Sequence, residues 1–154
     1  MIKKILLSAT GLIAVLAAAG SVMYVRNSTP GVPVIPVAEI ANPTRPYVIK
    51  VHAKWCPVCM MTKSIWSQID SMYSGRVNLV VLDLTNEGTI EKSRTEAKRL
   101  GLEKFFDEAT GATGTIAVLD GRTKEVRASI QGSRDINEYR AAIDASLRAD
   151  HTPL

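Results

Sequence analysis

Cysteine and histidine are scarce in this chain of 154 residues, which contains two of each. A structural zinc site usually takes four Cys or His ligands. The candidates here are Cys56, Cys59 and His52, with His151 close to the C-terminus. The composition therefore argues against a structural zinc site, and we expect no metal.

An excess of charge of one sign is also lacking outside the N-terminal segment. The net charge of +4 includes Lys3, Lys4 and Arg26. Without these three residues the chain has 16 basic and 15 acidic residues, a net charge of +1. A nucleic-acid-binding domain keeps a clustered basic excess on its folded part. We therefore expect no nucleic acid as a partner.

Charge is absent from residues 5–25, a stretch of 21 residues that is long enough to span a bilayer. Residues 1–26 are thus expected to be a signal anchor or a cleaved signal peptide, since Ala17–Ala19 offers a small-residue cleavage pattern. Apolar residues continue to Val25, which favours the anchor. Lys3 and Lys4 favour an N-terminus in the cytoplasm.

We accordingly expect a single-pass protein of the inner membrane whose body faces the periplasm or cell exterior. The alternative is a soluble periplasmic protein after cleavage. Cysteine is missing near the end of the segment, which excludes a lipoprotein-type attachment. Residues 27–46 hold five of the seven prolines and form a Pro-rich tether. Residues 47–148 are the size of one domain, and 149–154 form a C-terminal tail.

Hydrophobic periodicity predicts an α/β domain of order β-α-β-α-β-β-α. The helix over 57–73 is expected to bury an apolar stripe at helical spacing: Val58, Met61, Ile65, Ile69 and Met72. The first two strands should be parallel, and the last two form a hairpin that adds an antiparallel edge to a mixed sheet. The expected strands are 47–53, 77–84, 115–119 and 126–130, and the other helices are 89–100 and a last one that Ser133 and Asp135 cap and that runs to about Leu147.

Both cysteines lie in the segment Trp55-Cys56-Pro57-Val58-Cys59, where the first strand meets the first helix. A helix N-terminus stabilises a thiolate, which lowers the thiol pKa and makes a nucleophile near neutral pH. Cys59 lies one turn further on, within reach to close or open a disulfide. A purely structural disulfide is the alternative, but a bridge across so small a loop contributes little stability.

The W-C-x-x-C sequence at the first strand–helix junction, with this order of elements, resembles the thioredoxin superfamily over residues 45–148. Within it the chain looks like the membrane-tethered, extracytoplasmic thioredoxin-like proteins of bacteria. The resemblance implies a thiol–disulfide oxidoreductase in which Cys56 attacks and Cys59 resolves. It also implies that Cys56 is the more exposed thiol, that Trp55 covers one side of the pair, and that the redox-active disulfide serves in place of a bound cofactor.

The partners so implied are cysteine-containing protein substrates and a membrane electron donor. We favour a reductase of envelope proteins, with cytochrome c maturation as one such process; a disulfide oxidase or isomerase is the alternative within the enzyme class. The competing class is a non-catalytic thioredoxin-like module that binds a partner protein or copper(I). Copper could use both thiolates with Met60 or Met61, although Met61 is expected in the core.

The chain departs from the family at two places near the thiols. The family often has a buried acidic residue six positions before the attacking cysteine, and here that residue is Lys50. Its ammonium could favour thiolates or extend to solvent. The family's cis-proline is missing, because no proline stands between Pro57 and Pro153. Its place falls within the substrate-binding loop Thr113-Gly114-Thr115, at Gly114 by preference.

Three further residues are part of these expectations. His52, four residues before Cys56, either relays protons near the thiols or is a packed residue with one hydrogen bond, and we favour the packed residue. Phe105 and Phe106, between the second helix and the third strand, are expected in the core.

Overall fold

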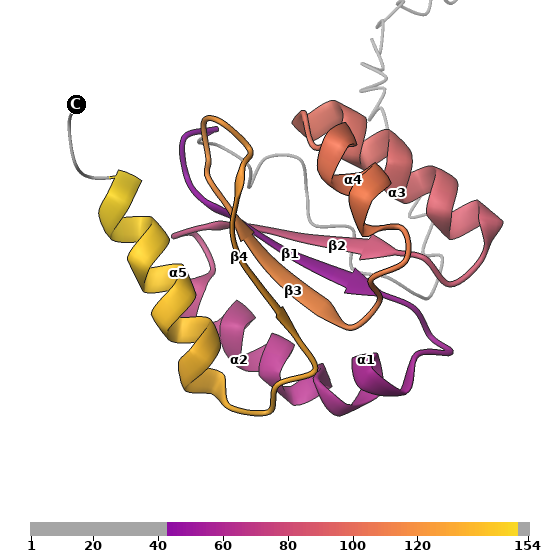
Figure 1. Cartoon of the computed structure of the whole chain (residues 1–154), viewed down its shortest axis with the longest axis horizontal. Coiled ribbons are helices and arrows are strands. Elements are labelled where there is room, and N and C mark those ends of the chain that lie inside the picture. The colour runs from indigo at the N-terminus through magenta and orange to yellow at the C-terminus, as the bar shows by residue number, and fades with distance from the viewer. Residues whose placement is uncertain (1–42, 151–154) are drawn as a thin grey trace, which may run out of the picture. The chain divides into compact units, whose positions relative to one another are not determined.

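The computed structural model describes residues 43–150, which form a four-stranded sheet with helices on both faces (Figure 1). The predicted signal segment (1–26), most of the predicted tether (27–46) and the end of the predicted tail lie outside the described residues. In chain order the elements are β1 (Tyr47–His52), α1 (Pro57–Met61), α2 (Lys63–Tyr73), β2 (Asn78–Asp83), α3 (Glu87–Leu100), α4 (Glu103–Ala109), β3 (Thr115–Leu119), β4 (Val126–Gln131) and α5 (Ile136–Asp150). Within residues 43–150, every helix is too short or too polar to span a bilayer.

The sheet has the strand order β2-β1-β3-β4, with β1 inside it. Strand β1 pairs in parallel with β2, from Tyr47 opposite Asn78 to His52 opposite Asp83. It pairs antiparallel with β3, and β3 pairs antiparallel with β4. The predicted mixed sheet with an antiparallel edge hairpin is therefore confirmed.

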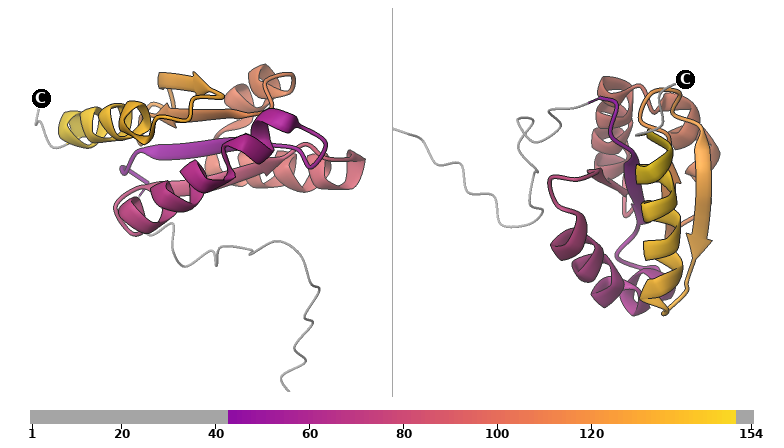
Figure 2. Two further views of the ribbon diagram at one scale, coloured as in Figure 1. Left: turned by 90° about the horizontal axis from the view of Figure 1, so that it is seen from below. Right: turned by 90° about the vertical axis from the view of Figure 1, so that its left-hand side faces the viewer.

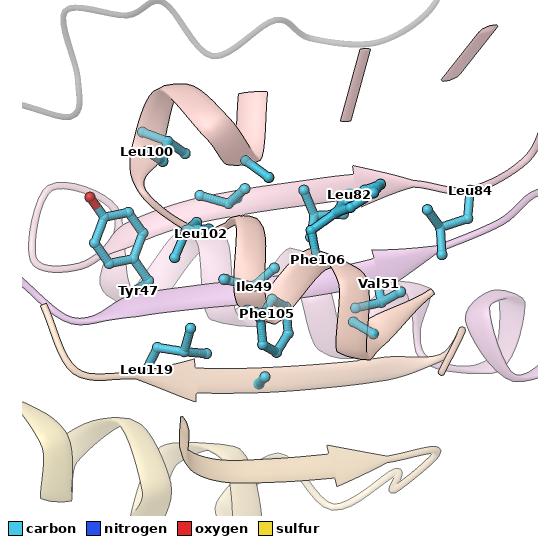
Figure 3. Packing of buried hydrophobic residues seen from close by; sticks show 14 residues of the cluster. Tyr47, Ile49, Val51, Leu82, Leu84, Leu100, Leu102, Phe105, Phe106 and Leu119 are labelled. Atoms are coloured by element: carbon cyan, nitrogen blue, oxygen red, sulfur yellow. The ribbon is translucent and has the colours of Figure 1, made fainter. Parts of the chain in front are cut away.

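Alternate residues of β1 contribute to two separate hydrophobic cores. Ile49 and Val51 pack against α3 and α4, in the cluster that Figure 3 shows. Val48 packs on the other face, against α2 and α5, which lie beside each other in Figure 2. Because both faces of β1 are covered, its C-terminal end is held rigidly where the cysteines follow.

The sequence did not predict helix α4. It begins two residues after Gly101, whose left-handed backbone (φ 70°) ends α3. Phe105 and Phe106 are buried in the core beneath α3, as expected. The preceding helix begins at Glu87 rather than at residue 89, because the Asn86 side chain caps it by accepting a hydrogen bond from the Thr89 amide.

The helix expected over 57–73 is broken at Thr62 into α1 and α2. Ile65 and Ile69 are buried as predicted, and Cys59, Thr62 and Tyr73 are the other buried residues of these two helices and the break. Met61 and Met72 are exposed, so the prediction that both belong to the buried stripe was wrong. The Thr62 hydroxyl donates to the carbonyl of Val58 at 3.0 Å and stabilises the break.

Candidate functional site

Cys56 is the N-cap of α1, at the point where the chain leaves β1. Its backbone is extended (φ −86°, ψ 114°), and its amide donates to the carbonyl of Ala53 at 3.2 Å. Pro57 follows at the first helical position, where its missing N–H has no partner to lose. The sequence thus places the Cys56 sulfur directly over the free amides of the first turn.

The two thiols differ in their contacts. The Cys59 amide donates to Sγ of Cys56 at 3.2 Å, whereas Sγ of Cys59 lies 3.8 Å from the carbonyl oxygen of Val51. Both cysteines are in the free thiol form. Cys56 is 4% exposed and Cys59 is 1% exposed, so Cys56 is the more exposed of the two by a small margin.

The pKa of Cys56 lies below its usual value. Burial acts to raise it, but hydrogen bonds to the sulfur outweigh burial. They come from the side chains of Cys59 and Thr113 and from the amides of Cys59 and Val58. Each of these donors favours the thiolate over the thiol, so Cys56 is the stronger nucleophile of the pair near neutral pH.

The pKa of Cys59 is raised. Burial is the main cause, and the hydrogen bond to Cys56 and the negative charge of its thiolate raise it further. The Ala53 backbone and the cation of Lys50 act in the opposite direction. Of the two adjacent thiols, Cys56 therefore ionises first, and Cys59 keeps its proton.

Gly114 lies against the cysteine pair, in the loop that leads into β3. Its φ is +87°, and an added Cβ would stand 2.6 Å from Cγ1 of Val58 and 3.6 Å from Sγ of Cys56. Its amide donates to the carbonyl of Val51 at 2.9 Å. The described residues contain no cis peptide bond, so a glycine in the left-handed region brings this loop to the thiols.

Two neighbours of this loop were missed by the sequence analysis. Nε2 of Gln131 donates to the carbonyl of Thr113 at 3.3 Å, and the Gly132 amide donates to the carbonyl of Gly114, also at 3.3 Å. An added Cβ on Gly132 would stand 3.1 Å from Val58. The one signal in the sequence was a glycine two residues after the last predicted strand.

Among residues 43–150, Trp55 and Met60 are the most exposed large apolar side chains, each 63% exposed, and they flank the cysteines in sequence. The Trp55 indole Nε1 donates to the carbonyl of Thr85 at 3.1 Å. The Thr85 hydroxyl in turn accepts from the Lys54 amide at 3.0 Å. Thr85 therefore anchors the indole, and nothing in the sequence had marked this threonine.

Lys50 is 7% exposed, so its side chain does not extend to solvent. Its Nζ lies 5.7 Å from the centroid of the Trp66 ring, at the distance of a cation–π contact. The pKa of Lys50 is lowered, mainly by burial. The thiolate of Cys59 acts to raise it again, and the charge of Lys63 acts to lower it.

His52 is partly buried at the end of β1, and its Nδ1 has no hydrogen-bond partner among the described residues. Burial lowers the pKa of His52, the charge of Lys50 lowers it further, and Asp83 acts to raise it. His52 is therefore held as a neutral imidazole. The expected single hydrogen bond is not made by Nδ1.

The described residues contain no group of three or more His, Cys, Asp or Glu that could hold a metal ion. Of the two methionines proposed as copper ligands, Met61 has its sulfur 3.0 Å from a guanidinium nitrogen of Arg134. A cation beside a thioether opposes the binding of a second cation.

The thioredoxin family model matches residues 37–97 of this chain, which include β1, the two cysteines and β2. Together with the mixed sheet, this match supports a thioredoxin-like α/β fold. No curated protein matches the chain.

Solved structures that are similar to this chain share little sequence with it. A malarial protein has 22% identity and a TM-score of 0.45, with 67% of this chain and 98% of that chain covered. DsbF of MTB, in mixed oxidised and reduced forms, has 18% identity and a TM-score of 0.47, with 67% and 81% covered. Thioredoxin O2 from Arabidopsis thaliana, in the oxidised state, has 18% identity and a TM-score of 0.43, with 66% and 75% covered.

Proposed function

We propose that this protein is a thiol–disulfide oxidoreductase that acts on cysteine-containing proteins. One observation carries the proposal: the hydrogen bonds around Cys56 lower its pKa, while burial beside Cys56 raises the pKa of Cys59. A purely structural disulfide needs no such difference between its two sulfurs. Thiol–disulfide exchange does need this difference, because one thiol attacks the partner disulfide first and the other attacks only after the mixed disulfide has formed.

The reaction in the reducing direction has two steps. The Cys56 thiolate attacks one sulfur of a partner disulfide, and the other partner sulfur leaves as a thiolate and takes up a proton from water. Cys59 then loses its proton to water and attacks Cys56. The bond between Cys56 and the partner breaks, and the partner sulfur that Cys56 had attacked leaves as a thiolate. Two electrons pass to the partner, and the Cys56–Cys59 disulfide is left.

The direction that we propose is reduction of envelope proteins on the extracytoplasmic side, with cytochrome c maturation as one such process. A membrane protein would re-reduce the Cys56–Cys59 disulfide, and residues 1–26 would keep the domain at the membrane. The apolar N-terminal stretch and the Pro-rich stretch after it support this arrangement.

A disulfide oxidase is the second candidate, and Lys50 is the observation that favours it. The buried cation of Lys50 favours the thiolate of Cys59. Anything that stabilises the dithiol form makes the disulfide a stronger oxidant. The redox potential of the couple decides between the two directions, since family members range from about −270 mV for thioredoxin to about −120 mV for the oxidant DsbA.

The experiment is reduction of insulin disulfides by the full-length chain in the presence of a chemical reductant, compared with its Cys56→Ser and Cys59→Ser variants. We expect turnover by the natural chain and none by Cys56→Ser. Cys59→Ser should instead accumulate mixed disulfides that a reductant releases. Full activity of Cys56→Ser would refute the proposed roles. Stoichiometric copper(I) uptake without any turnover would favour a binding module.

A further inference from the structure

A buried lysine, Lys50 of β1, contacts the helix α2, which follows the cysteines in the chain. In the register of the sheet, Lys50 of β1 lies between Val81 of β2 and Ile116 of β3. Its side chain is buried, with the ammonium near the ring of Trp66 on α2. Placing an ammonium there costs solvation free energy, so the position calls for a partner of opposite charge.

Cys59 contacts the backbone of β1 one residue beyond this lysine. Its sulfur lies 3.8 Å from the carbonyl of Val51, the residue that follows Lys50. The two groups influence each other in both directions: the Lys50 cation acts to lower the pKa of Cys59, and the Cys59 thiolate acts to raise the pKa of Lys50.

The other charged groups around Lys50 do not replace this partner. Lys63 at the start of α2 repels it. Asp83 lies beyond it, in register with His52, and its Oδ1 accepts from the Thr85 amide at 2.9 Å. Lys50 takes part in no salt bridge among the described residues. In the mixed disulfide, where Cys56 is bonded to the partner, the Cys59 sulfur is thus the group that can supply an anion to this ammonium.

We propose that Lys50 is a positioning residue for the resolving step, in which its ammonium stabilises the Cys59 thiolate inside the protein. The inference rests on the proposed function for its role in turnover. Cys59 gives its proton to water, and the resulting thiolate attacks Cys56 in the mixed disulfide. The bond between Cys56 and the partner sulfur breaks, and that sulfur leaves with the electron pair. Once the new disulfide has formed, the ammonium has lost its anion.

Two consequences follow from that change of charge. Lys50 increases the fraction of Cys59 that is ionised in the mixed disulfide and so accelerates release of the partner. At a pH at which Cys59 is ionised in the dithiol, it also stabilises the dithiol relative to the disulfide, which makes the couple more oxidising. A lysine that merely fills space between Val81 and Ile116 would produce neither effect.

The first test titrates Cys59 alone, by its thiolate absorbance in the ultraviolet, in full-length Cys56→Ser chain, with Cys56→Ser/Cys59→Ser as the blank. Adding Lys50→Met should move the titration to higher pH and lower the thiolate fraction at a given pH about tenfold. Lys50→Arg keeps the charge and should restore it. Lys104→Met removes the same charge from exposed α4, on the other face of the sheet, and should change nothing.

The second test is the glutathione redox equilibrium of the chain with both cysteines, measured at a pH at which Cys59 is ionised in the dithiol. Lys50→Met should shift the equilibrium constant about tenfold toward the disulfide, which is about 30 mV for a two-electron couple. If Lys50→Met does not fold by circular dichroism, Lys50→Gln replaces it with the same expected results.

Unchanged titration and potential in Lys50→Met, or an equal change in Lys104→Met, would overturn the inference. Failure of the proposed function looks different. If the natural chain reduces no protein disulfide but Lys50→Met still shifts the Cys59 titration, the function is wrong and the electrostatic role of Lys50 stands. If turnover is normal and the titration does not move, only the role of Lys50 is wrong.

Discussion

Gly114 and Val58 are packed so closely that a single added carbon on the glycine would stand 2.6 Å from Cγ1 of the valine. One residue comes from the loop before β3 and the other from between the two cysteines. The contact therefore sets the distance between the loop and the thiols. It also gives the first of four predictions.

Gly114→Ala should destabilise the protein by about 1–3 kcal/mol, because it adds a clash and places an alanine at φ +87°. The displaced loop should also slow alkylation of Cys56 at neutral pH. Urea unfolding and alkylation kinetics measure the two effects. Gly111→Ala is the matched control, since an added Cβ there meets nothing within 4 Å. Additional truncation of Val58 to Ala should recover part of the loss, and equal stability of both glycine variants would contradict the prediction.

Thr113→Val should weaken Cys56 as a nucleophile. The Thr113 side chain is one of the hydrogen-bond donors that lower the pKa of Cys56, so its removal should shift the alkylation profile to higher pH. At neutral pH the rate should fall by about threefold to tenfold. Thr110→Val is the control, because the Thr110 hydroxyl, at the C-terminal end of α4, donates to the carbonyl of Phe106. A profile that moves to lower pH would show that Thr113 does not act as a donor to the thiolate.

Asp120→Asn should cost about 2–3 kcal/mol of stability at neutral pH. Asp120 accepts hydrogen bonds from the Arg127 side chain and from the amides of Arg122 and Thr123, and these hold its pKa well below the usual range. Such a group stabilises the fold above its unfolded pKa of about 3.9, and the contribution is lost as the pH falls below that value toward the folded pKa.

The difference in unfolding free energy between the natural chain and Asp120→Asn should therefore be largest above pH 5 and shrink on acidification below about pH 4. Asp107→Asn is the control, because its ion pair with Arg94 is exposed and should be worth less than about 1 kcal/mol. A difference that stays constant with pH would mean that the ionised carboxylate contributes nothing.

Asn86→Ala should lower the free energy of unfolding by about 1 kcal/mol, since the Asn86 side chain caps α3. Urea titration at constant m value measures the loss. The thiol titrations should not change, because the cap interacts with Thr89 and not with the cysteines. Serine, which is also a good N-cap, should restore most of the stability, and an Asn86→Ser variant as unstable as Asn86→Ala would argue against capping as the cause.

The sequence predicted the sheet well because its strands are short, apolar and separated by turn residues. The run from Tyr47 to Ala53 and the Asp120-Gly121 turn each allow one interpretation, and both were placed correctly within a few residues. The position of the cysteines at the end of β1 follows from the same pattern. Local patterns of this kind depend on neighbours in the chain, which a sequence displays directly.

What the sequence could not supply depends on contacts between distant residues. The helix is broken at Thr62, a residue that is also compatible with an unbroken helix. The hydrophobic periodicity therefore predicted one continuous helix with Met61 in the core, whereas Met61 is exposed. Helix α4 is short, and its sequence carries no start signal. The bond from Gln131 to Thr113 and the anchoring of Trp55 by Thr85 join segments 18 and 30 residues apart.

The direction of the Lys50 side chain was equally inaccessible to sequence analysis. A lysine near the end of a strand can extend along the sheet to water or lie beneath a helix. The choice was settled by the ring of Trp66 on α2, which gives the ammonium a surface to contact. Only the packing of that helix against the sheet shows which way the charge points.

The break at Thr62 has a consequence for oxidative damage to the protein. It leaves the thioethers of Met60 and Met61 open to solvent within five residues of Cys56. Peroxide converts an exposed methionine to its sulfoxide, which is polar and chiral. Oxidative stress should therefore alter the rim of the site through two side chains that take no part in the chemistry, and repair of that damage requires a methionine sulfoxide reductase rather than a thiol.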